Sequence, residues 1–228
     1  MSNIAIIPAR GGSKRIPRKN VKDFCGEPII AYSIKAALSS GLFDEVMVST
    51  DDPEIAAISQ QYGASVPFLR SAENANDFAI TAAVLTEVLT NYKANNKSYQ
   101  YGCCIYPTAP FITAQRLKEA YTLLTANGFD TVLPVQSFSF PIQRAFFKEA
   151  SQISWVEPQH ALTRSQDLPK AYHDAGQFYF FNVGAFLQTQ KLITTNSGAV
   201  EISELEGQDI DNEIDWKLAE LKFRLMNP

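Results

Sequence analysis

Short apolar runs alternate along this chain with segments whose apolar residues recur at helical spacing, and this alternation constrains the fold most. The predicted strands are Ile4–Pro8, Glu45–Ser49, Gly102–Tyr106 and Thr131–Val135, with one or two more in Phe178–Leu187. The predicted helices are Pro28–Ser39, which has Pro28 in its first turn, Pro53–Tyr62, Ala79–Tyr92, Thr113–Ala126 and Glu213–Met226, capped near Asn212. The pattern is typical of an α/β protein with a mostly parallel central sheet and helices on both faces. Ligands of such sheets bind beyond the carboxyl ends of the strands.

The length of 228 residues predicts a single domain, 1–228. A hydrophobic content of 46% and a charged content of 19% are ordinary for a chain that buries a core. One segment, Gln136–Ala175, is rich in Phe, Pro, Gln and Arg and shows no clean period. We interpret residues 136–175 as an excursion from the sheet, either a lid or a subunit contact.

Composition argues against several classes of protein. No apolar stretch approaches the roughly 18–20 residues that span a bilayer, so we expect no membrane association. The apolar run Ile4–Ile7 is too short for a signal-peptide core, which predicts a cytoplasmic protein. The three cysteines are an odd number without metal spacing, so we expect them to be reduced. A net charge of −4 argues against nucleic acid as a partner.

Positive charge is concentrated directly after the first predicted strand. The run Arg10–Lys22 contains six of the chain's 20 Lys and Arg residues and no acidic residue. The rest of the chain has 14 basic against 24 acidic residues. An acidic chain that gathers its cations in one loop at a strand end predicts a site for a ligand with several negative charges. The alternative is a basic patch that is exposed to solvent and binds no ligand, which is what most runs of like charge are.

The loop has the residue types that bind phosphate. Gly11 and Gly12 let the backbone turn tightly and bring N–H groups, including that of Ser13, against an anion. Arg10 can hold a phosphate in a bidentate fork, and Lys19 can act as a point charge. The spacing fits neither the Walker loop nor the Gly-x-Gly-x-x-Gly dinucleotide motif.

A second group of candidate residues is Asp209-Ile210-Asp211. On an extended segment, residues two apart point to the same side, so the carboxylates of Asp209 and Asp211 can face one point. Two carboxylates with open positions elsewhere suit Mg²⁺, which shares its coordination with waters and substrate phosphates. The alternative is a solvent-facing acidic turn before a helix. Asp51-Asp52 is a competing acidic pair, although Asp52 is also a plausible N-cap for the helix that follows.

The stretch Ile6–Asn20 closely resembles the first motif of the CMP-sugar synthetases, which activate acidic sugars with CTP. Further resemblances follow in the same order along the chain: Val48–Asp52, Pro107–Pro110, Arg164–Pro169 and Asp209–Asp211. The resemblance implies a Rossmann-like fold of the nucleotide-diphospho-sugar transferase type. It also implies transfer of CMP from CTP to a nine-carbon acidic sugar, with Mg²⁺ and release of pyrophosphate. It further implies a homodimer in which 136–175 reaches the partner and completes its site in trans.

The same resemblance assigns roles to individual residues. The expected nucleotide contacts are Ala9, Arg10, Gly11, Gly12, Ser13, Lys19, Asn20, Arg70 and Thr81. The expected catalytic residues are Arg10, Lys19, Asp209 and Asp211, of which the two aspartates hold the metal. The other cations of the basic run, Lys14, Arg15, Arg18 and Lys22, are expected to strengthen the surrounding positive field.

The sugar side departs from the sialic acid synthetases. Tyr106 stands where those enzymes usually have Gln, and His173–Tyr179 replaces their Asn-Gly-Ala-Ile-Tyr segment. Both stretches, and Phe138–Arg144, resemble the branch of the family that uses pseudaminic acid. The expected sugar contacts are Tyr106, Thr108, Arg144, Arg164, Gln177 and Tyr179. Sialic acid, legionaminic acid or Kdo as the sugar, and a nucleotide-binding module without catalysis, stay open as alternatives.

Overall fold

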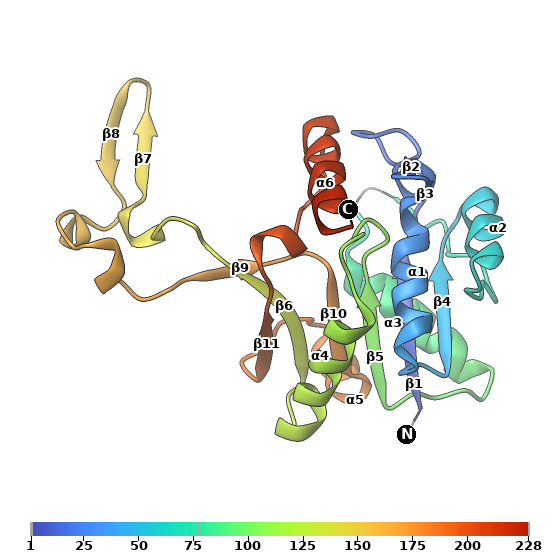
Figure 1. Ribbon diagram of the computed structural model, residues 1–228. Helices are drawn as coiled ribbons and strands as arrows, with labels where there is room; N and C mark the ends of the chain where they lie inside the picture. The colour runs from blue at the N-terminus through green and yellow to red at the C-terminus, as the bar shows by residue number, and fades with distance from the viewer. Residues whose placement is uncertain (1, 77, 228) are drawn as a thin grey trace.

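The computed structural model describes residues 2–76 and 78–227, and its centre is a mixed, mostly parallel sheet (Figure 1). The strands in their order across it are β11 (Ser197–Glu201), β6 (Thr131–Ser137), β10 (Phe178–Asn182), β5 (Tyr101–Ile105), β1 (Asn3–Pro8) and β4 (Glu45–Ser49), with β9 (Tyr172–Asp174) pairing on β6. β1 is parallel to β4 and β5, and β11 is parallel to β6. β10 is antiparallel to β5 and β6, and β9 to β6. The predicted fold class is confirmed.

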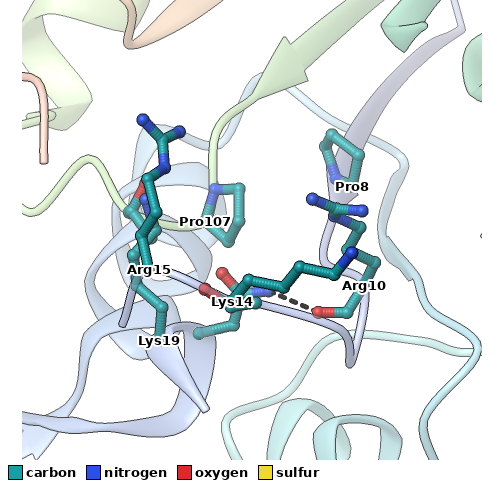
Figure 2. Close-up of a pocket in the computed structure, with 9 residues that line it drawn as sticks. Pro8, Arg10, Lys14, Arg15, Lys19 and Pro107 are labelled. Carbon is teal, nitrogen blue, oxygen red and sulfur yellow. Dashed lines mark hydrogen bonds between the residues drawn. The ribbon is translucent and has the colours of Figure 1, made fainter. Parts of the chain in front are cut away.

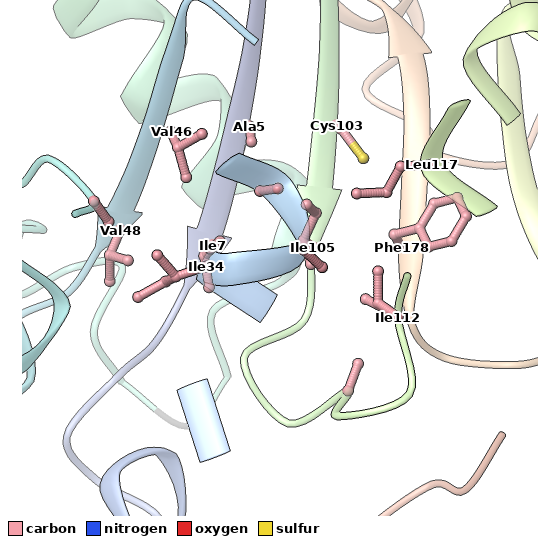
Figure 3. Close-up of a cluster of buried hydrophobic side chains, with 14 of the residues drawn as sticks. Ala5, Ile7, Ile34, Val46, Val48, Cys103, Ile105, Ile112, Leu117 and Phe178 are labelled. Atoms are coloured by element: carbon pink, nitrogen blue, oxygen red, sulfur yellow. The ribbon is translucent and has the colours of Figure 1, made fainter. Parts of the chain in front are cut away.

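Helices cover both faces of the sheet because the buried strands carry apolar residues on both sides. On one face lie α1 (Ile29–Ser40), α2 (Pro53–Gln61) and α4 (Ala114–Asn127); on the other lie α3 (Thr81–Ala94) and α5 (Val183–Thr189). Figure 3 shows part of the first core, where Ile34 and Leu117 meet Ile7, Ile105 and Phe178. The adjacent Cys103 and Cys104 lie in opposite cores, since successive strand residues alternate. All three cysteines are free, as expected.

Two of the predicted element boundaries are wrong. Pro28 is not in the first turn of α1: it ends the short strand β3 (Glu27–Pro28), which pairs with β2 (Asp23–Phe24), and it is the N-cap residue of the helix. The apolar run Phe178–Leu187 is a strand followed by a helix, α5, because the Asn182 side chain accepts a hydrogen bond from the Ala185 N–H and caps it.

A third apolar cluster joins the two ends of the chain. It contains Ile16 of the basic run and Ile210 and Trp216 near the C-terminus, together with Phe24, Ile29, Phe111 and Ala219. Trp216 belongs to α6 (Glu213–Met226), whose predicted N-cap, Asn212, accepts from the Ile214 and Asp215 N–H groups. Since Ile16 and Ile210 are 0% and 1% exposed, the basic run and the acidic segment are anchored in one core.

The chain leaves the sheet after β6 and returns on β9, and residues 138–171 form a projecting arm (Figure 1). The arm contains the hairpin β7 (Phe146–Glu149) and β8 (Gln152–Trp155) and the short 3₁₀ turns η2 (Ile142–Arg144), η3 (Pro158–His160) and η4 (Ser165–Asp167). It exposes apolar side chains, with Phe140 81% and Leu162 98% exposed. Two further 3₁₀ turns, η1 (Lys19–Val21) and η5 (Glu204–Glu206), lie outside the arm. Among the described residues, none of the helices has the length and apolar character to cross a membrane.

Candidate active site

A cavity of about 420 Å³ lies beyond the carboxyl ends of β1 and β5, where the ligand rule for such sheets places it (Figure 2). Its lining consists of Pro8, Arg10, Ser13, Lys14, Arg15, Lys19, Asn20, Pro107 and Thr108. β1 pairs with β4 on one side and β5 on the other, and the chain reaches β4 first and then crosses over to β5, so the strand order reverses at β1. The basic run therefore forms a wall of the cavity.

Hydrogen bonds fix the backbone of the loop. The Ala9 N–H donates to the Ser49 carbonyl at 2.9 Å, and the Gly11 N–H donates to Asp51 Oδ1 at 3.0 Å. The side-chain amide of Asn20 donates to the Arg10 carbonyl at 2.9 Å. In this arrangement Asn20 holds the loop in shape. Ala9, an expected nucleotide contact, is fully buried, and its N–H is taken by Ser49.

The two glycines have different surroundings. A Cβ on Gly11 would lie 2.7 Å from Asp52 Oδ2, whereas a Cβ on Gly12 would meet nothing within 4 Å. Asp52 is held in place because its carboxylate caps α2, as the sequence predicts, and pairs with Arg18. Gly11 therefore permits close packing of the loop against Asp52 at the start of α2. The backbone at Gly12 has free space beside it, where a ligand could approach.

The six cations of the run do not all face the cavity. Arg18 pairs with Asp52 and Glu54, and Lys22 pairs with Glu213 at 2.8 Å. These two cations are thus neutralised by acids from outside the run. Arg10, Lys14, Arg15 and Lys19 line the cavity. Lys14 and Arg15, expected only to strengthen the field, lie beside the residues assigned to the ligand.

Lys19 connects the loop to the acidic segment. Its ammonium group donates to the carbonyl of Ile210, and burial lowers the pKa of this lysine, while the charges of Asp211 and Asp209 oppose that shift. Both carboxylates are therefore close enough to Lys19 to act on its charge. Arg15 reaches the same segment and lies 2.8 Å from Asp211.

The environment of Asp209 and Asp211 suits a hard cation that binds few protein ligands. The buried side chain of Ile210 anchors the segment in the third core, while Asp209 is exposed and Asp211 half-buried. Within the described residues no group of three or more metal-ligating side chains occurs. Two carboxylates beside a loop of cations fit Mg²⁺, which takes its other oxygens from water and phosphate ligands.

Arg70 and Thr81 lie near the carboxyl ends of neighbouring parts of the sheet. Arg70 contacts Ser49 at the end of β4, and Thr81 contacts Tyr106, the residue after β5. Arg70 is buried and donates to the Ser49 hydroxyl at 3.1 Å; desolvation lowers the pKa of its guanidinium, while the charges of Asp51 and Glu87 oppose that shift. Thr81 is the first residue of α3, and its hydroxyl lies 3.5 Å from that of Tyr106.

The tyrosines predicted to contact the sugar touch each other. The rings of Tyr106 and Tyr179 meet edge to face with centroids 5.6 Å apart. The Tyr179 hydroxyl donates to Asp174, a residue that sequence reasoning did not single out. The neighbouring Gln177 is 4% exposed and donates its side-chain amide to the Glu206 carbonyl, so here it braces the segment that leads to Asp209.

A family model described as cytidylyltransferase matches residues 4–207. The chain belongs to the cytidylyltransferase family. The match includes the whole basic run and ends two residues before Asp209, so the acidic segment lies outside it.

Individual cytidylyltransferases resemble the chain over nearly its full length. A pseudaminic acid cytidylyltransferase of Campylobacter jejuni is 42% identical over 226 residues, covering 99% of this chain and 97% of the relative. A CMP-N,N'-diacetyllegionaminic acid synthase of Legionella pneumophila is 33% identical, with 99% and 97% covered. The solved structure of a CMP:2-keto-3-deoxy-manno-octonic acid synthetase complexed with CTP superposes with a TM-score of 0.72 at 17% identity, covering 100% and 99% of the two chains. This last likeness concerns the fold.

The residues assigned to the sugar are not all brought to the cavity of this cytidylyltransferase. Tyr106, Gln177 and Tyr179 do not line it, and two others lie on a separate part of the chain. Arg144 and Arg164 lie in the arm, which projects away from the sheet (Figure 1). Arg164 pairs with Asp167 at 2.7 Å, and Arg144 lies 3.4 Å from the Ser165 hydroxyl. Thr108, in contrast, lines the cavity directly.

Proposed function

We propose that this cytoplasmic enzyme transfers CMP from CTP to the anomeric hydroxyl of pseudaminic acid and releases pyrophosphate, for use in bacterial surface glycans or flagellin. The observation that carries the proposal is the cavity at the ends of β1 and β5, which four cations line and from which Arg15 and Lys19 reach the Asp209–Asp211 segment. The choice of sugar is supported by the 42% identity to a relative with that name over nearly the whole chain.

In the proposed reaction the anomeric hydroxyl of the sugar loses its proton to solvent, and its oxygen forms a bond to the α-phosphorus of CTP. The bond from this phosphorus to the bridging oxygen breaks, and that oxygen leaves on pyrophosphate. Arg10, Lys19 and the backbone of Gly11–Ser13 hold the triphosphate and neutralise charge on the leaving group. Positioning and charge neutralisation supply most of the catalysis in such displacements.

Asp209 and Asp211 are the residues that would hold Mg²⁺. When bound, the ion neutralises phosphate charge and orients phosphate oxygens. The chain's own part is to keep these carboxylates beside Lys19, and it does so through the buried side chain of Ile210.

The remaining predicted residues form two further parts of the site. Asn20, Arg70 and Thr81 are the proposed cytidine side, with Asn20 acting through the shape of the loop. Tyr106, Thr108, Gln177 and Tyr179 form the proposed sugar side; of these, Thr108 lines the cavity and Tyr106 lies next to Thr81.

We further propose that the enzyme is a homodimer in which the arm of one subunit reaches the cavity of the other. The arm carries Arg144 and Arg164 away from the cavity of their own chain, and a sugar carboxylate requires a cation. The exposed Phe140 and Leu162 give the arm an apolar surface of the kind that subunit contacts bury. In this arrangement the partner subunit's Arg164 completes each site.

Pyrophosphate release tests the proposed function. Purified enzyme with CTP and Mg²⁺ is supplied in parallel with pseudaminic, legionaminic and sialic acids and Kdo, and the CMP-sugar is identified by mass. The proposal predicts the highest kcat/KM with pseudaminic acid. Turnover confined to one of the other sugars would contradict the choice of sugar, and CTP binding without turnover on any of them would indicate a non-catalytic nucleotide-binding module.

A further inference from the structure

The carboxylate of Asp174 lies at the end of a row of polar side chains that leads to the proposed sugar side. One of its oxygens, Oδ2, accepts a hydrogen bond of 2.5 Å from the Tyr179 hydroxyl. The Tyr179 ring contacts that of Tyr106, whose hydroxyl lies 3.5 Å from that of Thr81. The four residues come from four places in the fold: β9, β10, the residue after β5, and the start of α3.

The other oxygen of Asp174 fixes the turn on which the carboxylate sits. Oδ1 accepts from the Gly176 N–H at 2.8 Å, and Gly176 has a φ of 63°, a conformation that favours glycine. This turn joins β9, the strand on which the arm returns, to β10, which carries Tyr179. Asp174 is thus held by its own turn and has one oxygen left for Tyr179.

The hydrogen bond to Asp174 sets the direction of the Tyr179 hydroxyl. A carboxylate oxygen accepts, so Tyr179 donates its proton toward β9 and turns its oxygen lone pairs toward the rest of the row. Tyr179 is 6% exposed, and burial raises the pKa of its hydroxyl, which therefore stays protonated and keeps this direction. Tyr106 packs against a ring that cannot rotate freely.

We propose that Asp174 is a positioning residue for sugar binding, acting through Tyr179 on Tyr106. The inference rests on the proposed function, since it takes these tyrosines to contact the acidic sugar. Asp174 itself touches Tyr179, and its effect appears mainly in the use of the sugar. Thr81, a proposed cytidine contact, lies two side chains further along the row, so the effect on CTP binding is small.

The test uses Asp174→Asn in the full-length enzyme. The asparagine oxygen can still accept from Gly176, but its amide group faces Tyr179 and donates, which reverses the direction of that hydrogen bond. We expect the KM for pseudaminic acid to rise about tenfold and the KM for CTP to stay within about twofold. Glu201→Gln is the matched control, because Glu201 accepts a similar bond of 3.1 Å from Tyr172 on the exposed surface.

A double-mutant cycle separates positioning from a general structural effect. In a Tyr179→Phe background the hydroxyl is gone, so Asp174→Asn should add less than about twofold to the KM for the sugar. Full additivity, or equal rises in the KM for both substrates, would overturn the inference. If Asp174→Asn does not fold, Tyr179→Phe alone decides, and an unchanged KM for the sugar overturns it.

The two proposals fail in different ways. A wild-type enzyme that does not transfer CMP to pseudaminic acid would overturn the proposed function and this inference with it. Wild-type transfer together with unaltered sugar kinetics in both variants would overturn this inference alone.

Discussion

Arg15 and Asp211 form an ion pair of 2.8 Å that joins the basic run to the acidic segment. Their side chains are 69% and 43% exposed, so the pair adds little to the free energy of folding. Both residues lie in the proposed triphosphate and metal region, where phosphate and a divalent cation are stronger partners for each of them. We therefore regard the pair as a contact that the substrates can replace at low cost.

Asp211→Asn should weaken the use of Mg²⁺ and leave the fold intact. It removes one of two carboxylates from a site with few protein ligands, so we expect pyrophosphate release to fall at least about 100-fold and half-maximal activity to need more Mg²⁺. The measurement is the rate against Mg²⁺ concentration, with thermal melting as a check of folding. Glu213→Gln, which breaks only the exposed pair with Lys22, is the control. An unchanged Mg²⁺ dependence would remove Asp211 from the proposed metal site.

Gly11→Ala and Gly12→Ala should separate packing from ligand binding. The new Cβ at position 11 would press against Asp52, so we expect a loss of about 1–3 kcal/mol in the free energy of unfolding. At position 12 the space is open, so stability should change little while CTP affinity falls, because a methyl group keeps the phosphate from the backbone. Urea denaturation and CTP titration measure the two effects. Equal stabilities for the two variants would contradict the packing argument.

Glu206→Gln should destabilise the protein in a pH-dependent way. The hydrogen bond from Arg116 lowers the pKa of Glu206 from 4.5 to about 2, and the two side chains tie α4 to η5 at 2.8 Å. A lowered carboxyl pKa stabilises the fold above the unfolded value and loses that effect as pH falls through the folded value. The stability difference between wild type and Glu206→Gln should therefore be full above pH 4.5 and shrink toward pH 2.

Chemical denaturation at a series of pH values checks this prediction. Glu119→Gln is the matched control, since Glu119 also pairs with Arg116 but lies on the same helix and joins no second element. Its effect should be smaller at every pH. A difference for Glu206→Gln that stays constant from pH 7 to pH 2 would exclude the ion pair as its cause.

Mixed dimers should show whether the arm works in trans. Arg164→Ala removes a residue of the arm, and Asp211→Ala removes one beside the cavity. If each site combines one subunit's cavity with the other's arm, one site of a hybrid dimer carries both changes and the other carries neither. Equimolar mixing after subunit exchange should then restore roughly a quarter of wild-type activity. No recovery after confirmed exchange would place arm and cavity of one site in the same chain.

Sequence reasoning predicted the parts of the fold that depend on local patterns. The strand before the basic run, the Asp52 cap and the Asn212 cap all follow from neighbouring residues and agree with the structure. The strand-to-helix change at Asn182 was missed because a continuous apolar run fits either element, although an Asn at that point is itself a capping signal. The short strand β11 carried no recognised pattern.

In the candidate site, too, features that depend on neighbouring residues were predicted, and features that depend on distant contacts were not. The position of the loop followed from its place after a strand, and the cavity lies there. The separate roles of its cations did not follow, because Arg18 and Lys22 find their acidic partners in α2 and α6, far along the sequence. Asp174 was missed for a similar reason, since its link to Tyr179 depends on how β9 and β10 meet across a turn.

The shared core of Ile16 and Ile210 has a consequence for the order of events during synthesis. Lys19 and the carbonyl it contacts are 191 residues apart, so the proposed phosphate side of the site leaves the ribosome long before the acidic segment. A nascent chain can pair β1, β4 and β5 and hold the basic loop with no counter-charge from Asp209 and Asp211. If Asp209 and Asp211 have the proposed role, catalytic competence arrives only with the segment that begins at Asp209, and a chain interrupted before that residue would bind anions without being able to use them.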